Sequence, residues 1–68
     1  MSLPAARTAY LQATLRLHDA QLRSSLTRRD VDATARQVND ANTAALEARR
    51  AWEYARDALV VAALEEEG

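Results

Sequence analysis

The feature that most constrains this chain is the absence of glycine and proline from residues 5–67. The one proline is Pro4 and the one glycine is Gly68, so nothing between them interrupts a helix or supplies a left-handed turn. Most residues in this stretch are alanine, leucine, arginine, glutamate and glutamine, which favour helices. The sequence therefore predicts an all-α protein without strands.

The chain has 68 residues, enough for one small domain with a limited core. Sixteen of its apolar residues are alanine, and bulk comes mainly from nine leucines, four valines, Trp52 and two tyrosines. A domain of fewer than ~70–80 residues rarely obtains more than ~3–5 kcal/mol from a single core. Because there is no cysteine, neither a disulfide nor a thiolate metal site can supplement that core.

Both ends of the chain resemble short remnants of an expression vector. These are residues 1–3 and 67–68, which leave a single helical-hairpin domain over residues 4–66. We expect this domain to be either complete or excised from a longer protein whose own N-terminus is missing. The longest apolar run, residues 58–64, is far shorter than the ~20 residues of a membrane-spanning helix. The sequence predicts no membrane span and leaves the cellular location open, with the cytoplasm as the default.

Residues 24–28 carry the clearest signal for a turn. They begin Ser-Ser-Leu-Thr, whose short polar side chains compete for backbone hydrogen bonds, and Thr27 is followed three residues later by Asp30, as in a capping box. A first helix should begin at Ser2, which can cap its N-terminus. We predict that the chain turns over residues 24–28, and that Thr27 and Asp30 cap a second helix that ends near residue 65.

The second helix has an apolar seam with a heptad repeat. Its residues are spaced alternately three and four apart, which places them along one side of the helix: Val31, Thr34, Val38, Ala41, Ala45, Ala48, Trp52, Ala55, Leu59 and Ala62. The repeat passes through polar residues 39–43 without a change of phase, so we predict a continuous helix there, with a break as the alternative. Large residues alternate with alanine, which favours close antiparallel packing. The predicted hairpin core is Tyr10, Leu17, Val31 and Val38.

The first helix also has a second apolar face, formed by the leucines at positions 11, 15, 22 and 26 with His18 among them. A helix that is apolar on two faces needs two partners, and the second helix is only one of them. The predicted helices differ in length by about 16 residues, or ~24 Å. Residues 52–64 would therefore extend beyond the first helix, and another protein surface would have to shield them from water.

These two apolar surfaces predict self-association. The predicted interface residues are Leu11, Leu15, Leu22, Leu26, Trp52, Leu59, Val60 and Leu64. We expect a homodimer that forms a four-helix bundle, or a higher coiled-coil-like homo-oligomer; a protein partner is the alternative occupant. The leading interpretation is a small helical protein–protein interaction or oligomerisation module.

The sequence offers little for catalysis or metal binding. His18 is the only histidine, and without cysteine it has no second zinc ligand. A di-iron site built from Glu-x-x-His is excluded because residue 15 is leucine. The acidic residues fall on polar helix faces and at helix ends, not in pairs within a predicted pocket. We predict a non-enzymatic protein without a cofactor or a metal ion.

One further pattern lies near the predicted turn. Arg16, Ala20 and Thr27 are spaced Arg-x3-Ala-x6-Thr and are followed by Asp30-Val31 and Ala33. Over residues 15–46 this arrangement resembles the hairpin tips of periplasmic efflux adaptors and of their outer-membrane channels. Those tips typically carry Arg, Leu and Ser at the first three positions, so two of the three differ here. The resemblance implies a hairpin that docks on another protein through Arg16 and Thr27.

A nucleic-acid-associated helical protein is the third interpretation, with phosphate contacts from Arg7, Arg16, Arg23, Arg28 and Arg29. The net charge of −1 argues against it, because nucleic-acid binders need a positive surplus to neutralise phosphates. We expect weak or no duplex DNA binding at near-physiological ionic strength, as measured by fluorescence anisotropy of a labelled duplex. Sub-micromolar binding with a steep salt dependence would reverse this ranking.

Overall fold

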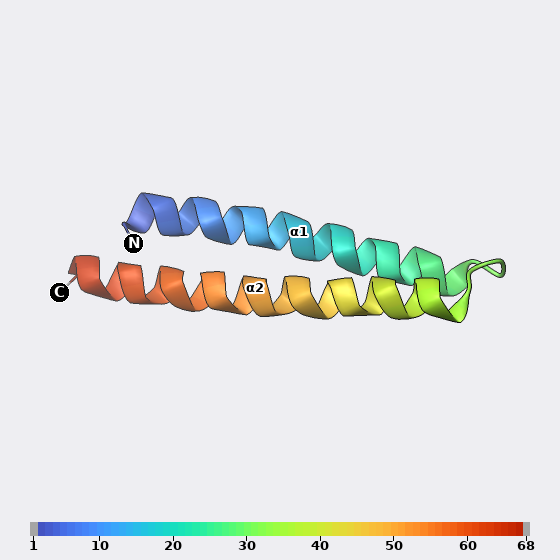
Figure 1. The fold of residues 1–68 in the computed structure, drawn as a ribbon. Helices are drawn as coiled ribbons and strands as arrows, with labels where there is room; N and C mark the ends of the chain where they lie inside the picture. Colours follow the sequence, from blue (N-terminus) through green and yellow to red (C-terminus); the bar gives the residue numbers. More distant parts are fainter. Residues whose placement is uncertain (1, 68) are drawn as a thin grey trace.

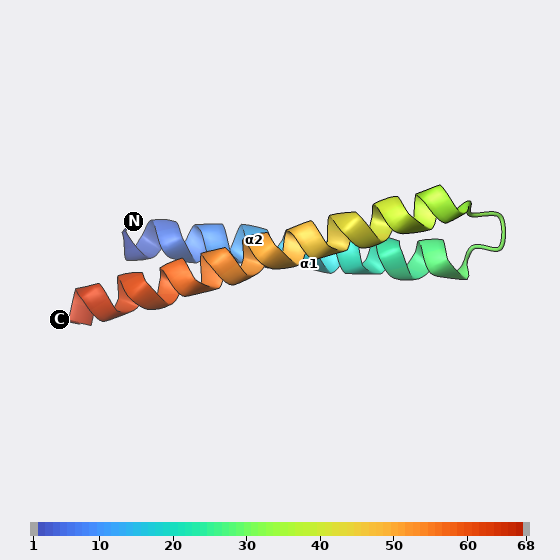
Figure 2. The ribbon, with the colours of Figure 1, turned by 60° about the horizontal axis from the view of Figure 1, so that its bottom comes forward.

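The computed structural model describes residues 2–67 as an antiparallel pair of helices (Figure 1). Helix α1 spans Leu3–Arg29, helix α2 spans Ala35–Glu67, and residues 30–34 join them. The pair forms a rod of 54 × 13 × 12 Å with both termini at one end. Figure 2 shows α2 crossing α1 at a shallow angle, as expected for helices that share a heptad seam. The predicted all-α hairpin is therefore confirmed.

The N-terminus of α1 lies where the sequence predicts it. The Ser2 hydroxyl accepts a hydrogen bond from the Ala5 amide at 3.4 Å, and Pro4 lies in the first turn. Met1 and Gly68, which the sequence assigns to vector remnants, lie outside the described residues. Helix α2 runs without a break through residues 39–43, so the heptad repeat indicated its continuity correctly. Within residues 2–67, no helix has an apolar stretch long enough to cross a membrane.

The predicted turn over residues 24–28 is wrong, because α1 continues through it to Arg29. The Thr27 hydroxyl donates a hydrogen bond to the Arg23 carbonyl at 2.7 Å, so the side chain is satisfied without leaving the helix. Ser24 is buried, and its hydroxyl donates to the Asn42 side-chain oxygen on α2 at 2.6 Å. Both polar side chains thus find acceptors inside the hairpin.

Asp30 and Thr34 each cap one helix across the loop. Asp30 ends α1, where its amide donates to the Leu26 and Thr27 carbonyls, and its carboxylate accepts from the Asp32 amide at 3.0 Å. The cap of α2 is Thr34, whose hydroxyl accepts from the Gln37 amide at 3.1 Å while the Gln37 side chain accepts from the Thr34 amide at 2.9 Å. This reciprocal pair is a capping box. The assignment of Thr27 and Asp30 as the cap of the second helix is therefore a misassignment.

Val31 lies in the loop and is 95% exposed, which corrects its assignment to the hairpin core. The heptad repeat includes this position, but the capping box starts α2 only after it. From Val38 onward the repeat faces α1: Ala41, Ala55 and Ala62 are buried, and Val38, Ala45, Ala48, Trp52 and Leu59 are half-buried. On α1 the facing residues are buried Ala6 and Ser24 with half-buried Tyr10, Ala13, Leu17 and Ala20.

The capping box at Thr34 generates the first structural prediction. Thr34→Ala removes the acceptor for the Gln37 amide and should lower the free energy of unfolding by about 1 kcal/mol. The matched control is Thr43→Ala, an exposed position inside α2 where the change should be neutral or slightly stabilising. Denaturant unfolding followed by circular dichroism, at one protein concentration, measures both. A larger loss for Thr27→Ala than for Thr34→Ala would contradict the observed helix boundaries.

Candidate protein-interaction surface

Four leucines of α1 form an exposed row on the side of the helix that faces away from α2. Leu11, Leu15, Leu22 and Leu26 expose between 52% and 59% of their surface, whereas Leu17 on the seam side is half-buried. The row arises because residues 11, 15, 22 and 26 lie within a narrow arc at 100° per residue, opposite the seam. We call these four residues the leucine stripe. His18 is exposed and lies between the two halves of the leucine stripe.

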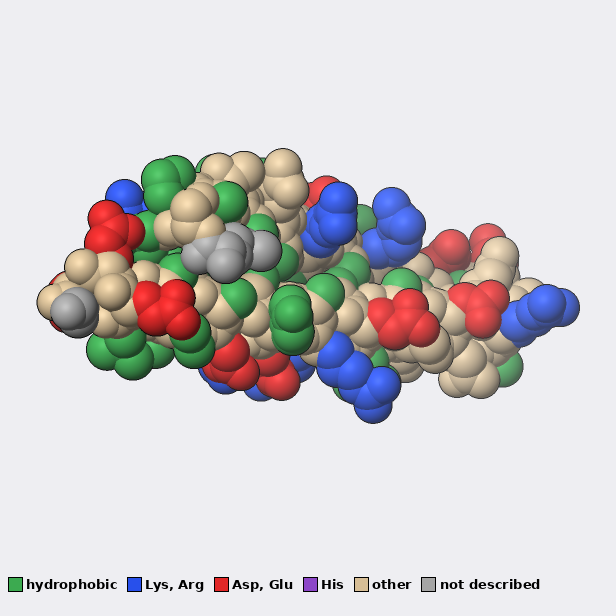
Figure 3. Space-filling model, turned by 60° about the vertical axis from the view of Figure 1, so that its left-hand side comes forward, with side chains coloured by type: hydrophobic (Ala, Val, Ile, Leu, Met, Phe, Trp, Pro, Cys, Tyr) green, Lys and Arg blue, Asp and Glu red, His purple; other side chains and the backbone are tan. Residues whose placement is uncertain are grey.

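A second apolar surface lies on α2 near its C-terminus. Val60, Val61 and Leu64 are each more than half exposed, and Tyr54 exposes 77% of its surface. Tyr54, Ala58 and Val61 line an open groove together with Asp57, Ala62 and Glu65. Figure 3 looks toward the end that carries both termini and shows hydrophobic side chains at the surface beside acidic ones. The chain thus exposes apolar residues on both helices.

Trp52, which the sequence assigns to the intermolecular interface, is half-buried in this structure and packs against α1. Its ring lies 5.9 Å from the Tyr10 ring at an interplanar angle of 40°. Its indole nitrogen donates to the Thr14 hydroxyl at 3.0 Å, and that hydroxyl donates to the Tyr10 carbonyl at 2.8 Å. The guanidinium carbon of Arg56 lies 5.3 Å from the Trp52 ring centroid, within cation–π range.

Leu59, another predicted interface residue, also lies in the part of α2 that runs beside α1. Because α1 extends to Arg29, α1 and α2 have 27 and 33 residues, and α1 accompanies α2 along most of its length. The predicted overhang over residues 52–64 is thereby reduced to about 9 Å of helix at 1.5 Å per residue. Leu59 is half-buried, while Val60 and Leu64 remain exposed.

Two side-chain hydrogen bonds between the helices fix the register of the hairpin. One joins Ser24 to Asn42 and the other joins Trp52 to Thr14. The two α1 residues are ten apart, as are the two α2 residues, so both bonds specify the same alignment. A slip by one residue would break both bonds and leave the buried Ser24 hydroxyl without its acceptor. The two bonds therefore define the alignment of α1 along α2.

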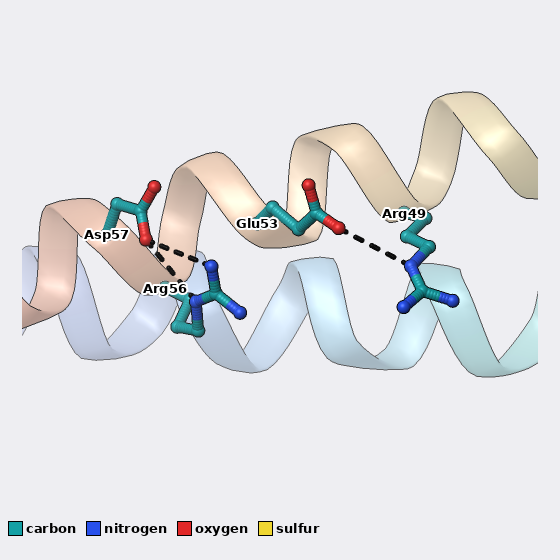
Figure 4. A network of polar contacts seen from close by, with 4 residues as sticks. All are labelled: Arg49, Glu53, Arg56 and Asp57. Carbon is teal, nitrogen blue, oxygen red and sulfur yellow. Dashed lines mark hydrogen bonds and ion pairs between the residues drawn. The ribbon is translucent and has the colours of Figure 1, made fainter.

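The ion pairs of α2 lie at the surface and contribute little to stability. Arg49 pairs with Glu53 at 3.4 Å and Arg56 with Asp57 at 3.2 Å. Figure 4 shows both pairs along α2. All four side chains are about half exposed or more, and such pairs are typically worth under ~1 kcal/mol.

The two helices differ in net charge. Helix α1 has five arginines and one aspartate, which gives +4, while α2 has four arginines and seven acidic residues, which gives −3.

The other predicted sites remain dispersed. Within the part of the chain that the structure describes, no three histidine, aspartate or glutamate side chains gather as metal ligands. Arg7, Arg16, Arg28 and Arg29 are exposed along α1. Beside the loop, an open groove is lined by residues of both charges: Arg23, Thr27, Asp30, Ala33, Gln37, Asp40, Ala41 and Ala44. This mixture of charges makes no dedicated anion site.

Comparison with known proteins yields no family assignment. No protein-family model, no curated protein and no solved structure matches this chain at a significant level. The functional argument therefore rests on the residues and their placement.

The Trp52 contacts generate a second structural prediction. Trp52→Phe keeps a ring beside Tyr10 but removes the hydrogen bond to Thr14, and should destabilise the hairpin by about 1 kcal/mol. Trp52→Ala also removes the ring contact and should cost about 2–3 kcal/mol, below the ~3–5 kcal/mol of a fully buried tryptophan. The exposed Tyr54→Ala serves as control and should change stability by less than ~0.5 kcal/mol. Equal losses for Trp52→Ala and Tyr54→Ala in thermal unfolding would show that Trp52 does not pack against α1.

Proposed function

We propose that this chain is a helical protein–protein interaction module that self-associates through the leucine stripe of α1. The observation that carries the proposal is the alignment of four leucines, each more than half exposed, on the face of α1 opposite α2. Single exposed leucines are common on monomeric proteins, whereas several exposed leucines aligned on one helix face favour an interaction site. Val60 and Leu64, which the sequence also assigns to the interface, are exposed on α2 and lie outside this stripe.

The composition of the core supports the same proposal. Among residues 2–67, the buried apolar residues are the alanines Ala6, Ala41, Ala55 and Ala62, and no large side chain is fully buried. An alanine side chain contributes little apolar area, so this core supplies less stabilisation than one of leucines. Association that covers the leucine stripe would add the missing burial and would stabilise the folded state by mass action. The proposed assembly is a homodimer of four helices or a coiled-coil-like oligomer.

The leucine stripe alone should support only moderate affinity. Burying a whole leucine side chain is worth about 1.5–3 kcal/mol, and each stripe leucine is already partly covered. The gain must also exceed the loss of translational and rotational freedom on binding, about 4–15 kcal/mol. We therefore expect dissociation constants in the micromolar range and an assembly that responds to concentration.

The structure offers no specific support for the two alternative functions. In the efflux-hairpin alternative Thr27 would contact another protein, yet its hydroxyl is bonded to the Arg23 carbonyl and its side chain is half-buried. In the nucleic-acid alternative the arginines of α1 would contact phosphates, yet Asp30 and Asp32 lie at the same end of the rod as Arg28 and Arg29. Self-association remains the better-supported proposal.

Substitutions in the leucine stripe test the proposal. The double change Leu15→Ser/Leu22→Ser should shift the protein from oligomer to monomer at tens to hundreds of micromolar while helical content is retained, because both positions are outside the hairpin seam. The matched control is Leu46→Ser, which alters an equally exposed leucine on α2. Sedimentation velocity and the concentration dependence of thermal unfolding measure the effect. A wild-type chain that stays monomeric throughout this range, with unfolding independent of concentration, would overturn the proposal.

A further inference from the structure

We infer that the partner of the leucine stripe is the same stripe of a second copy, packed antiparallel about a two-fold axis that passes between the levels of residues 18 and 19. This inference rests on the proposed function and names the partner and its orientation. Closed two-fold dimers are the commonest symmetric assemblies, and their interface must be complementary to itself. The leucine stripe meets that requirement in its spacing and in the charges beside it.

The spacing of the leucine stripe is the same in both directions along α1. Its successive gaps are four, seven and four residues, so the stripe is symmetric about the midpoint between His18 and Asp19. When two copies are placed antiparallel about this midpoint, Leu15 comes level with Leu22 of the second copy. Leu11 likewise comes level with Leu26 of the second copy. Every stripe leucine is therefore opposite a leucine, with no polar residue interposed at those levels.

Charge favours the antiparallel arrangement over the parallel one. In a parallel, in-register pair each of the five α1 arginines would lie level with its own copy, and like charges at that separation repel. In the antiparallel pair, residues whose numbers sum to 37 share a level, and no arginine meets an arginine. Arg7 then comes level with Asp30 of the second copy, and Arg16 with Gln21. The antiparallel pair avoids the five exact arginine–arginine pairings and adds an Arg7–Asp30 pairing at each end. Like charges still lie one residue apart in level at two places, Arg7 with Arg29 of the second copy and Asp19 with its own copy.

The hairpin leaves the leucine stripe accessible for such a contact. The seam residues of α1, such as the buried Ala6, face α2, and the stripe lies on the opposite side of the helix. Two α1 helices can therefore pack in the centre of the dimer with one α2 on each outer side. The two register-fixing hydrogen bonds lie on the seam side and are undisturbed.

The absence of cysteine from the chain allows a clean cross-linking test of this geometry. His18 lies beside the proposed axis, so the His18→Cys variant should form a disulfide-linked dimer with itself under mild oxidation while all four leucines are retained. The Leu11→Cys variant should not, because its two copies would be about 22 Å apart along the helices, beyond disulfide reach. An equimolar mixture of Leu11→Cys and Leu26→Cys should form the mixed dimer. Thr43→Cys, exposed on α2, serves as control and should form no disulfide-linked dimer.

Each outcome of the cross-linking decides the orientation. Cross-linking of Leu11→Cys and of Leu26→Cys each to itself would show a parallel pair and overturn the inference. Efficient cross-linking of Thr43→Cys with none at His18→Cys would show a contact through α2 and overturn it as well. These results are distinguishable from failure of the proposed function, in which Leu15→Ser/Leu22→Ser leaves the sedimentation of the chain unchanged.

Ionic strength supplies an independent readout of the partner. Because α1 carries +4, two α1 helices brought together repel weakly over long range, and salt screens that repulsion. Raising the ionic strength from about 0.02 M to about 0.5 M, where the Debye length falls well below 10 Å, should therefore tighten the dimer. A dimer that dissociates as salt is added would indicate that α1 docks on the acidic α2 of the second copy, and would overturn the inference.

Discussion

The hairpin depends on close contact between two helix backbones at positions occupied by alanine. Ala6 on α1 and Ala41, Ala55 and Ala62 on α2 are the buried apolar residues, and their single methyl groups allow the helices to approach closely. Larger residues in the seam, such as Trp52, are only half-buried. The seam therefore aligns the two helices and brings many atoms close to the two backbones into contact, but it removes little apolar surface from water.

This limited burial connects the inside of the hairpin to its outer surface. A two-helix unit that already buried large side chains between its helices could tolerate a polar exterior. Here the leucines that could have filled a core are instead distributed to the outer face of α1, at positions the seam cannot use. The register set by Ser24 with Asn42 and by Trp52 with Thr14 holds that face in a single orientation. The packing of α1 on α2 thus both aligns the two helices and leaves the leucine stripe exposed to solvent.

The fold class, the seam from Val38 onward and the outer leucines follow from spacing and composition, which depend on one helix at a time. The turn could not be placed in this way, because the acceptor of the Ser24 hydroxyl is Asn42, a residue of the other helix. Thr34 followed three residues later by Gln37 is the sequence pattern of a capping box and could have indicated the start of α2. The heptad repeat continues through both positions, so it favoured an earlier start for the helix. Moving the turn to residues 30–34 lengthens α1 and shortens α2 together, which is why Trp52 and Leu59 lie beside α1 and not beyond it.

The loop between the helices has an evolutionary consequence. The Asp30 amide caps the last carbonyls of α1, and the Thr34–Gln37 pair caps the start of α2, so neither cap uses the side chain of Val31 or Asp32. Lengthening a loop costs little entropy, about 0.6 kcal/mol for each doubling. New sequence inserted between these two caps would change neither the seam nor the leucine stripe. The loop is thus the position where descendants of this chain can acquire a new segment while retaining the rod that carries it.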